Sequence, residues 1–329
     1  MQSLKLTKQK SIYLIVMLAV AALIIYLPIG GSRRNINIGI LVFIYIALGQ
    51  SWNLLSGMSG LFSIAHALFY GIGAYGMSLM LARAGSNPLV GLLVGIAANL
   101  VVALIVGLVG SKLSGLYFTM ALIGIHSIFY TLAGQLTITG GWLGISLPRE
   151  WQLTRKELYV LGLCMAVLMT VIFQVIRSSR VGTMFVALKE NPQLAASLGV
   201  NIRGWRILAV LISATMASIV GSFYAIYMMA HNAEVFNGTV SLRIMMVCMV
   251  GGVGHIFGPW VGAILIIMDE YIRGAMPTEF ASLSVVIYAL VLIVMALLRP
   301  QGIMGSKIFQ PKEIDVRSIE NQDAKADAE

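Results

Sequence analysis

The sequence predicts an all-α polytopic membrane protein with about ten transmembrane helices, and two observations support that prediction. Of its 329 residues, 59% are hydrophobic and only 11% are charged, whereas a soluble domain carries about 25% charged residues. Apolar runs of roughly 20 residues, the length that crosses a bilayer, recur along almost the whole chain. Because so few charges cannot coat a water-soluble globule of this size, lipid is the expected solvent for most of the surface.

The first apolar run follows three lysines within the first ten residues and therefore mimics a secretory signal peptide. No A-x-A-like cleavage site of small residues comes after it, so we predict an uncleaved first helix. Nine further runs have the length and apolar character of spans. The ten predicted spans lie near residues 11–29, 36–55, 58–82, 88–110, 115–133, 157–176, 206–230, 240–256, 258–275 and 281–298.

Basic residues predict the orientation of these spans. With the N-terminus inside and ten crossings, 14 of the 22 Lys and Arg residues fall on the inside, as the positive-inside rule favours. We therefore predict cytoplasmic residues 1–10, a transmembrane domain over 11–306 and a cytoplasmic, disordered tail over 307–329. Two longer loops interrupt the domain, 134–156 on the outside and 177–206 on the inside.

The sequence contains no recognisable enzyme motif. It has no GxxxxGK[ST], HExxH or GxSxG pattern, so we predict a chain that is not an enzyme and holds neither cofactor nor metal. Asp269-Glu270 lies near a span end and is interpreted as a solvated face, and Cys164 and Cys248 as reduced packing residues. The net charge of +9 comes from scattered loop residues without a basic stripe, so no nucleic-acid partner is predicted.

Glycine punctuates two of the predicted spans, roughly 190 residues apart. A broken helix is tolerated in a membrane only where protein buries it or where it lines a water-filled cavity, and paired interrupted segments point to a transport pathway. The spacing also indicates a possible five-helix pseudo-repeat, with close helix packing through small residues as a compatible alternative. The glycines are Gly57, Gly60, Gly71, Gly73 and Gly76 in one span, and Gly251, Gly252, Gly254, Gly258 and Gly262 in the other.

The inside loop predicts a short capped helix. Asn191 before Pro192 is typical of an N-cap with proline in the first turn, and Gly199 is typical of a C-terminal cap. Residues 184–189 predict another short helix before it. Such a segment either docks on a partner protein or lies on the membrane surface. Three apolar residues between the caps share one face at helical spacing: Leu194, Ala195 and Leu198.

Two histidines, His66 and His126, lie within apolar spans. An ionisable group at such a depth invites a functional hypothesis. The interpretation favoured here is a neutral histidine that is hydrogen-bonded to a neighbouring helix.

Six pieces of sequence, in the right order, cover roughly residues 36–305, and the ordered set is more specific than any single piece. They are 53–75 (NLLSGMSGLFSIAHALFYGIGAY), 115–120 (GLYFTM), 139–144 (TGGWLG), the loop residues Lys189-Glu-Asn with Ala195, Ala196 and Gly199, 251–263 (GGVGHIFGPWVGA) and 299–305 (RPQGIMG). Together they resemble the signature of the permeases of branched-chain amino acid ABC importers, and more closely the longer, LivM type of the two paired LivH/LivM permeases.

The resemblance implies the partners and location of the chain. We expect a multi-pass subunit of a bacterial inner-membrane importer, paired with a second, homologous permease. Two ATP-binding subunits would bind ATP and Mg²⁺ on the cytoplasmic side, leaving this chain without a cofactor. A periplasmic solute-binding protein would deliver leucine, isoleucine or valine.

The resemblance also implies roles for residues in three segments. The ATPase-coupling residues would be Lys189, Glu190, Asn191, Ala195, Ala196 and Gly199, together with Pro192, which the family pattern does not predict. The translocation path would run past Ser63, His66, Gly71, Gly73, Gly252 and Gly254. The loop facing the binding protein would contain Thr139, Gly140 and Gly141.

Two other functions stay open from the sequence. One is a permease of the same architecture for urea, short amides or other amino acids, because binding proteins set the selectivity of such systems. The other is an ion-driven secondary transporter or channel that works alone. The lack of paired intramembrane carboxylates and the structured inside loop both argue against it.

Overall fold

The computed structural model describes residues 33–113, 116–275, 286, 290, 293, 294, 297 and 302–304. Its α-helices are α2 (Arg33–Trp52), α3 (Ala67–Ala82), α4 (Pro88–Lys112), α5 (Leu116–Gln135), α6 (Arg155–Ser178), α7 (Arg180–Glu190), α8 (Pro192–Ser197), α9 (Ile202–Met228), α10 (Gly238–Gly251), α11 (Gly258–Gly262) and α12 (Ile264–Ala275). The remaining elements are a π-helical turn (Asn53–Met58), the 3₁₀ turns Gly141–Leu143, Arg149–Trp151 and Ala233–Phe236, and the antiparallel strands β1 (Ile145–Ser146) and β2 (Ala230–His231).

The described helices confirm the all-α membrane class. Five of the helical stretches are long and apolar enough to cross a bilayer: 33–58, 88–112, 117–135, 155–178 and 202–228. Helices α3 and α10 are apolar but shorter, with 16 and 14 residues. The first predicted span (11–29), most of the tenth (281–298) and both termini lie outside the described residues, so ten crossings and a five-helix repeat stay predictions.

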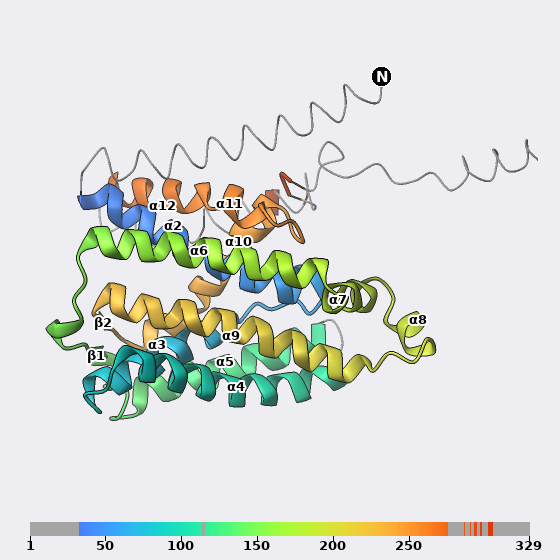
Figure 1. Cartoon of the computed structure of the whole chain (residues 1–329), viewed down its shortest axis with the longest axis horizontal. Coiled ribbons are helices and arrows are strands. Elements are labelled where there is room, and N and C mark those ends of the chain that lie inside the picture. The colour runs from blue at the N-terminus through green and yellow to red at the C-terminus, as the bar shows by residue number, and fades with distance from the viewer. Residues whose placement is uncertain are drawn as a thin grey trace, which may run out of the picture.

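Helix α2 forms the centre of the bundle. Its sequence from Ile38 to Leu48 is almost continuously apolar, and a helix that is hydrophobic all round belongs in the interior. Ile40, Phe43 and Leu48 are at most 1% exposed. Around it pack α6, α9, α10 and α12, and Figure 1 shows α2 and α6 running side by side along the length of the molecule.

A second layer of α3, α4 and α9 packs through small residues. A Cβ on Gly73 would overlap the backbone of Ser218, and one on Gly221 would overlap the Tyr70 carbonyl. Buried Asn99 joins all three helices, because its side-chain amide donates to the Phe69 carbonyl at 3.2 Å and to the Ala214 carbonyl at 2.6 Å. Small residues let membrane helices approach closely, and polar groups then link them, so close packing explains part of the glycine pattern.

The outer faces of α4, α5 and α6 are apolar. Leu93 and Val101 on α4, Met120 on α5, and Val160 and Val175 on α6 are 57–66% exposed. A contiguous apolar surface of this extent is not found on soluble monomers. These faces are therefore the expected lipid contact.

The two glycine-rich segments are interrupted helices, and they meet each other. The chain is not helical between Ser59 and His66, and α10 and α11 are separated by residues 252–257. Asn53 joins the two interruptions: its side-chain amide donates to the His255 carbonyl at 2.9 Å, and its Oδ1 accepts from the Gly254 N–H at 2.6 Å. Gly254 has φ +80°, a conformation that glycine adopts at little cost. Side-chain hydrogen bonds from Asn53 thus satisfy part of the irregular backbone, as a membrane requires.

Candidate functional site

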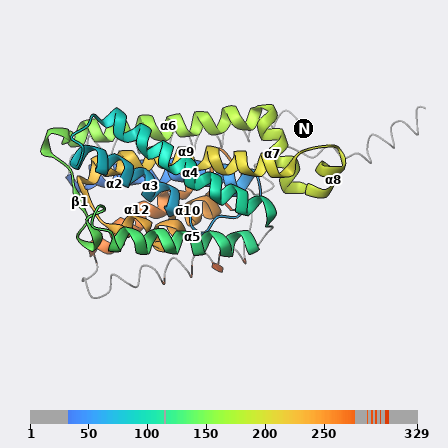
Figure 2. The same cartoon turned by 90° about the horizontal axis from the view of Figure 1, so that it is seen from below.

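The two long loops lie at opposite ends of the helix bundle. Figures 1 and 2 both place α7 and α8 at one end, with α8 projecting beyond the bundle, and β1 at the other. Strand β1 belongs to the 134–156 loop and pairs with β2, with Ile145 opposite His231. A solute crossing the bundle along its axis would therefore pass from one loop to the other.

The loop predicted to face a binding protein is tightly folded. The Thr139 hydroxyl donates to the Ala133 and Leu136 carbonyls at 2.8 and 2.6 Å, which closes the end of α5. Gly140 and Gly141 both have positive φ, +75° and +56°. The three residues thus shape a turn at this end, and their contact with a binding protein stays a prediction.

At the opposite end, the predicted capped helix is present as α8. Asn191 Oδ1 accepts from the Leu194 N–H at 3.0 Å, with Pro192 as the first helical residue. Gly199 follows the last turn with φ +83°. Its N–H donates to the Ala196 carbonyl at 2.9 Å, and the next N–H donates to Ala195 at 3.1 Å, the hydrogen-bond pattern of a Schellman cap. The caps predicted from sequence are confirmed.

The apolar residues of α8 do not share one environment as the spacing predicts. Ala195 is buried, whereas Leu194 and Leu198 are 57% and 76% exposed. The inward turn of Ala195 anchors the short helix, and the two leucines face outward. The prediction of one shared apolar face was therefore wrong for Ala195. Leu194 and Leu198 form an exposed apolar surface at this end of the protein.

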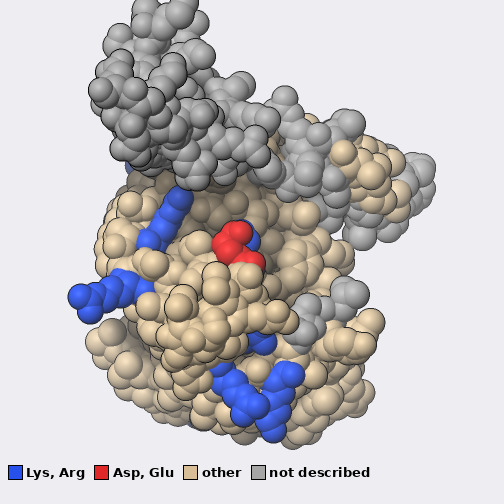
Figure 3. Space-filling model, turned by 90° about the vertical axis from the view of Figure 1, so that its right-hand side faces the viewer, with Lys and Arg blue, Asp and Glu red and all other residues tan. Residues whose placement is uncertain are grey.

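Charges around α8 are mostly basic. Arg177, Arg180, Lys189 and Arg203 are exposed at this end, with Glu190 as their acidic neighbour, and Figure 3 shows blue side chains around one red patch here. The Lys189 stem lies against Gly60 in the first interruption. The predicted coupling segment is thus in contact with one of the two broken helices.

His66 lies in a buried network between helices. The single Ser51 hydroxyl proton goes to the Ser213 carbonyl at 2.7 Å, so His66 Nε2, 2.8 Å from the same hydroxyl oxygen, is the donor there. Ser213 in turn donates to the Ser51 carbonyl at 2.9 Å. His126 Nε2 likewise contacts the Phe236 carbonyl. Both histidines bond to neighbouring elements, which is the arrangement favoured from the sequence.

The other residues predicted for a translocation path are packed in the protein interior. Ser63 is fully buried, Gly71 lies against the Phe236 ring and Gly73 against Ser218. Gly252 and Gly254 form the turn of the second interruption. None of these residues, nor His66, lines the cavity described next, and their role in a path stays a prediction.

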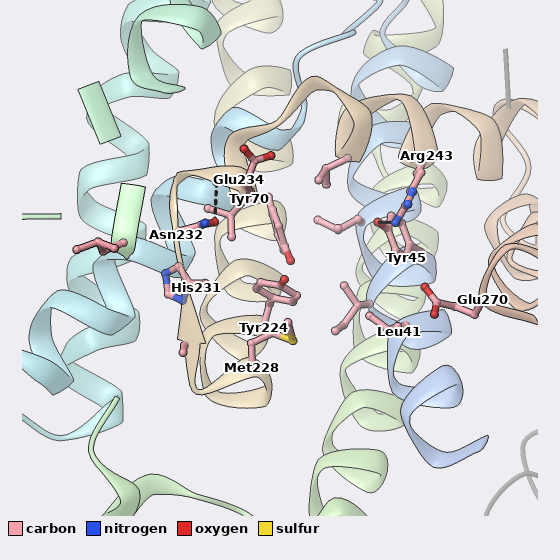
Figure 4. A pocket seen from close by; sticks show the side chains of 16 residues that line it. Leu41, Tyr45, Tyr70, Tyr224, Met228, His231, Asn232, Glu234, Arg243 and Glu270 are labelled. Carbon is pink, nitrogen blue, oxygen red and sulfur yellow. Dashed lines mark hydrogen bonds between the residues drawn. The ribbon is translucent and has the colours of Figure 1, made fainter. Parts of the chain in front are cut away.

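A cavity of about 500 Å³ lies between α2, α3, α9, α10, α12 and residues 230–235. Figure 4 shows two facing walls, with Tyr70, Tyr224 and His231 on one side and Tyr45 and Glu270 on the other. Burial lowers the pKa of His231 to about 4, so its ring is uncharged at neutral pH. The sequence analysis did not identify this cavity, because its lining comes from five helices far apart in the chain.

The expectation of a solvated face at Asp269-Glu270 was wrong for Asp269. This residue is 5% exposed, and its carboxylate lies 3.5 Å from the Arg243 guanidinium in an ion pair. Burial of a lone charge in an apolar bundle is costly, so intramembrane charges pair with one another. The signal in the sequence is Arg243, a lone charge near the start of the predicted span 240–256.

These features define a multi-pass helical membrane protein of the transport class, with interrupted helices, an internal cavity and structured loops at both ends. The chain belongs to the family described as the permease component of the branched-chain amino acid transport system, whose model matches residues 35–296. It is similar to the high-affinity branched-chain amino acid transport permease LivM of Escherichia coli K12, with 26% identity over 91% of this chain and 76% of that protein.

It is also similar to the high-affinity branched-chain amino acid transport permease LivH of Escherichia coli K12, with 24% identity over 79% of this chain and 91% of that protein. A probable LivH of Methanocaldococcus jannaschii is 25% identical over 45% of this chain and 48% of that protein. No solved structure matches the chain.

Proposed function

We propose that this chain is the membrane-spanning permease subunit of a binding-protein-dependent ABC importer for leucine, isoleucine and valine. The family and the names of its relatives give the substrate class. The observation in the structure that supports it most is the separation of two structured loops, α7–α8 and 134–156, at opposite ends of one bundle (Figures 1 and 2). A permease that receives solute from a binding protein on one side of the membrane and is driven by ATP-binding subunits on the other needs contact surfaces at both ends.

The proposed assembly contains a second, homologous permease, two ATP-binding subunits and a periplasmic binding protein in a bacterial inner membrane. ATP and Mg²⁺ bind on the ATP-binding subunits, and no cofactor is assigned to this chain. Both termini and α7–α8 face the cytoplasm, and 134–156 faces the periplasm. The two interruptions joined at Asn53 are the remnant of a duplicated five-helix unit.

Coupling in this proposal starts at α8. Leu194 and Leu198 insert into the ATP-binding subunits, where burial of their exposed apolar surface is favourable. Movement of α7 reaches the first interruption through Lys189 and Gly60, and reaches the second through Asn53. The broken helices then rearrange around the path in an alternating-access cycle.

The first test is the composition of the native assembly. The tagged chain is purified from native membranes in mild detergent, and its companions are identified by mass spectrometry. We expect two ATP-binding subunits, a second permease and a binding protein that takes leucine rather than urea on titration. A chain that comes out alone even after crosslinking would contradict the proposal and favour a secondary transporter. Urea binding instead would keep the architecture and change the solute.

The second test addresses α8. Leu194→Asp with Leu198→Asp places two charges on the proposed contact, so the ATP-binding subunits should no longer co-purify and import should stop. Leu143→Asp is the control for co-purification alone, because Leu143 is 99% exposed in the loop at the other end and should leave the ATP-binding subunits attached. A charge exchange, Lys189→Glu with Glu190→Arg, tests the polar part of the surface. Intact ATPase coupling in both the double-leucine variant and the charge exchange on α7 would exclude the docking assignment.

A further inference from the structure

The cavity between α2, α3, α9, α10 and α12 has an Arg–Glu pair of charges on one wall and a second carboxylate, Glu234, on the other. Arg243 on α10 and Glu270 on α12 both line it, and in Figure 4 both side chains lie across the gap from Tyr70 and Tyr224. Arg243 lies 3.5 Å from Asp269 and donates to the Tyr45 hydroxyl at 3.5 Å. Asp269 is buried and does not line the cavity, so its carboxylate positions the Arg243 guanidinium from the protein interior.

The facing wall is polar, and its carboxylate, Glu234, accepts from the Tyr130 hydroxyl at 3.0 Å and from the Asn237 side-chain amide at 2.6 Å. Tyr70 and Tyr224 have ring centroids 5.2 Å apart, and their hydroxyls point toward one another at the cavity surface (Figure 4). His231 is uncharged, and Asn232 is fixed by its bond to the Glu234 N–H at 3.0 Å. Tyrosine faces and hydroxyls suit an ammonium group, so this wall adds to Glu270 rather than competing with it.

The remainder of the lining is aliphatic. Leu41, Ile44 and Leu48 come from α2, with Val235 and Val240 from the segment before and within α10. The volume of about 500 Å³ lies in the range of small-molecule sites, about 300–1,000 Å³. Few convergent polar groups in an otherwise apolar cavity are what such a site needs to orient a ligand.

The cavity lies toward the end that carries β1 and β2. Leu143 from the 134–156 loop and residues 230–232 both contribute to its lining. Leu143 is 99% exposed, so it marks the edge of the cavity. The cavity is therefore within reach of a solute released at this end.

We propose that this cavity is a binding site for a zwitterionic amino acid with an aliphatic side chain. Arg243 takes the α-carboxylate, for which a guanidinium fork is the matching donor. Glu270 takes the ammonium, and Ile44, Leu48 and Val240 surround the side chain. The assignment rests on the proposed function and adds to it a solute site within this subunit. Urea carries neither charge and would leave both groups without a ligand partner.

Protection from a thiol reagent tests the site directly. Val240→Cys is made in a Cys164→Ser background, because Cys164 is exposed. The complete transporter is reconstituted in lipid without its binding protein and labelled with a small charged thiol reagent. L-Leucine should slow labelling, leucine amide and 4-methylpentanoate should do so less, and urea should have no effect. Ile138→Cys is the control, since Ile138 is exposed in the loop but does not line the cavity.

A charge variant and a steric variant sharpen the test. Glu270→Gln should raise the leucine concentration for half-protection by roughly tenfold and leave protection by 4-methylpentanoate, which has no ammonium, unchanged. Val240→Phe should fill the cavity and stop import, whereas Val101→Phe on the outer face of α4 should not.

The outcomes separate this assignment from the proposed function. If the preparation imports leucine with its binding protein but leucine never slows Val240→Cys labelling, the cavity is not the site and the importer stands. Wild-type import by Val240→Phe would also overturn the site. A preparation that imports no leucine would overturn both.

Discussion

Single side chains determine how the broken helices of this protein are tolerated. Asn53 supplies a donor to one backbone carbonyl and an acceptor to one backbone N–H of the opposite interruption. A side-chain amide is well suited to this role because it carries both functions on one planar group. The partly buried backbone at residues 254 and 255 therefore depends on one residue about 200 positions away in the sequence.

Replacement of Asn53 should separate the two interruptions. Asn53→Ala leaves the Gly254 N–H and the His255 carbonyl without their partner, and buried groups that lose a partner cost roughly 1–3 kcal/mol each. We expect a lower melting temperature in detergent and reduced import at unchanged assembly with the ATP-binding subunits. Asn53→Asp keeps the acceptor but buries a charge and sets an oxygen against the His255 carbonyl, so its loss of stability should be at least as large. An Asn53→Ala protein with wild-type melting and import would show that the link is dispensable.

At the scale of elements, the sequence predicted helix ends and interruptions better than helix neighbours. The caps at Asn191 and Gly199 and the breaks near Gly57–Gly60 and Gly252–Gly254 are local signals, and all four are present in the structure. The pair of Arg243 with Asp269 links α10 to α12, and apolar periodicity does not encode which spans become neighbours. The same limit hid the cavity, whose walls come from five helices.

Alanine substitutions at two glycines can separate the cost of a steric clash between helices from the gain in helix propensity. A Cβ on Gly221 would overlap the Tyr70 carbonyl of α3, whereas Gly124 on α5 has no atom within 4 Å of its Cβ position. Gly221→Ala should destabilise the protein by roughly 1–3 kcal/mol, because the clash is with backbone. Gly124→Ala should be neutral or stabilising by up to about 1 kcal/mol.

Thermal unfolding of the two variants in the same detergent gives the comparison. Equal loss of stability in both would mean that α3 and α9 do not approach through Gly221. If both variants were as stable as the wild type, α3 and α9 could move apart at low cost. That outcome would contradict the tight contact between these helices.

At the scale of the whole molecule, the proposed mechanism requires the two ends of the bundle to face opposite compartments. The membrane class followed from composition, because 11% charged residues cannot solvate a protein of this size. Orientation is a weaker inference from sequence, since eight of the 22 basic residues fall on the side predicted to be outside. The structure adds that 134–156 and α7–α8 lie at opposite ends, so one labelled position at each end decides the orientation.

Single cysteines at Leu143 and Leu198 test that orientation, because these leucines are 99% and 76% exposed. Both are introduced with Cys164→Ser; Cys248 is fully buried and donates to the Gly49 carbonyl, so the background protein should not react. In cells with a permeabilised outer membrane, a membrane-impermeant maleimide should label Leu143→Cys. It should label Leu198→Cys only after the inner membrane is opened, and faster without the ATP-binding subunits, because α8 is then uncovered. The reverse labelling pattern would mean that the bundle has the opposite orientation, with α8 outside the cytoplasm and inaccessible to an ATPase. Labelling of both positions from one side would contradict a bundle that spans the membrane between them.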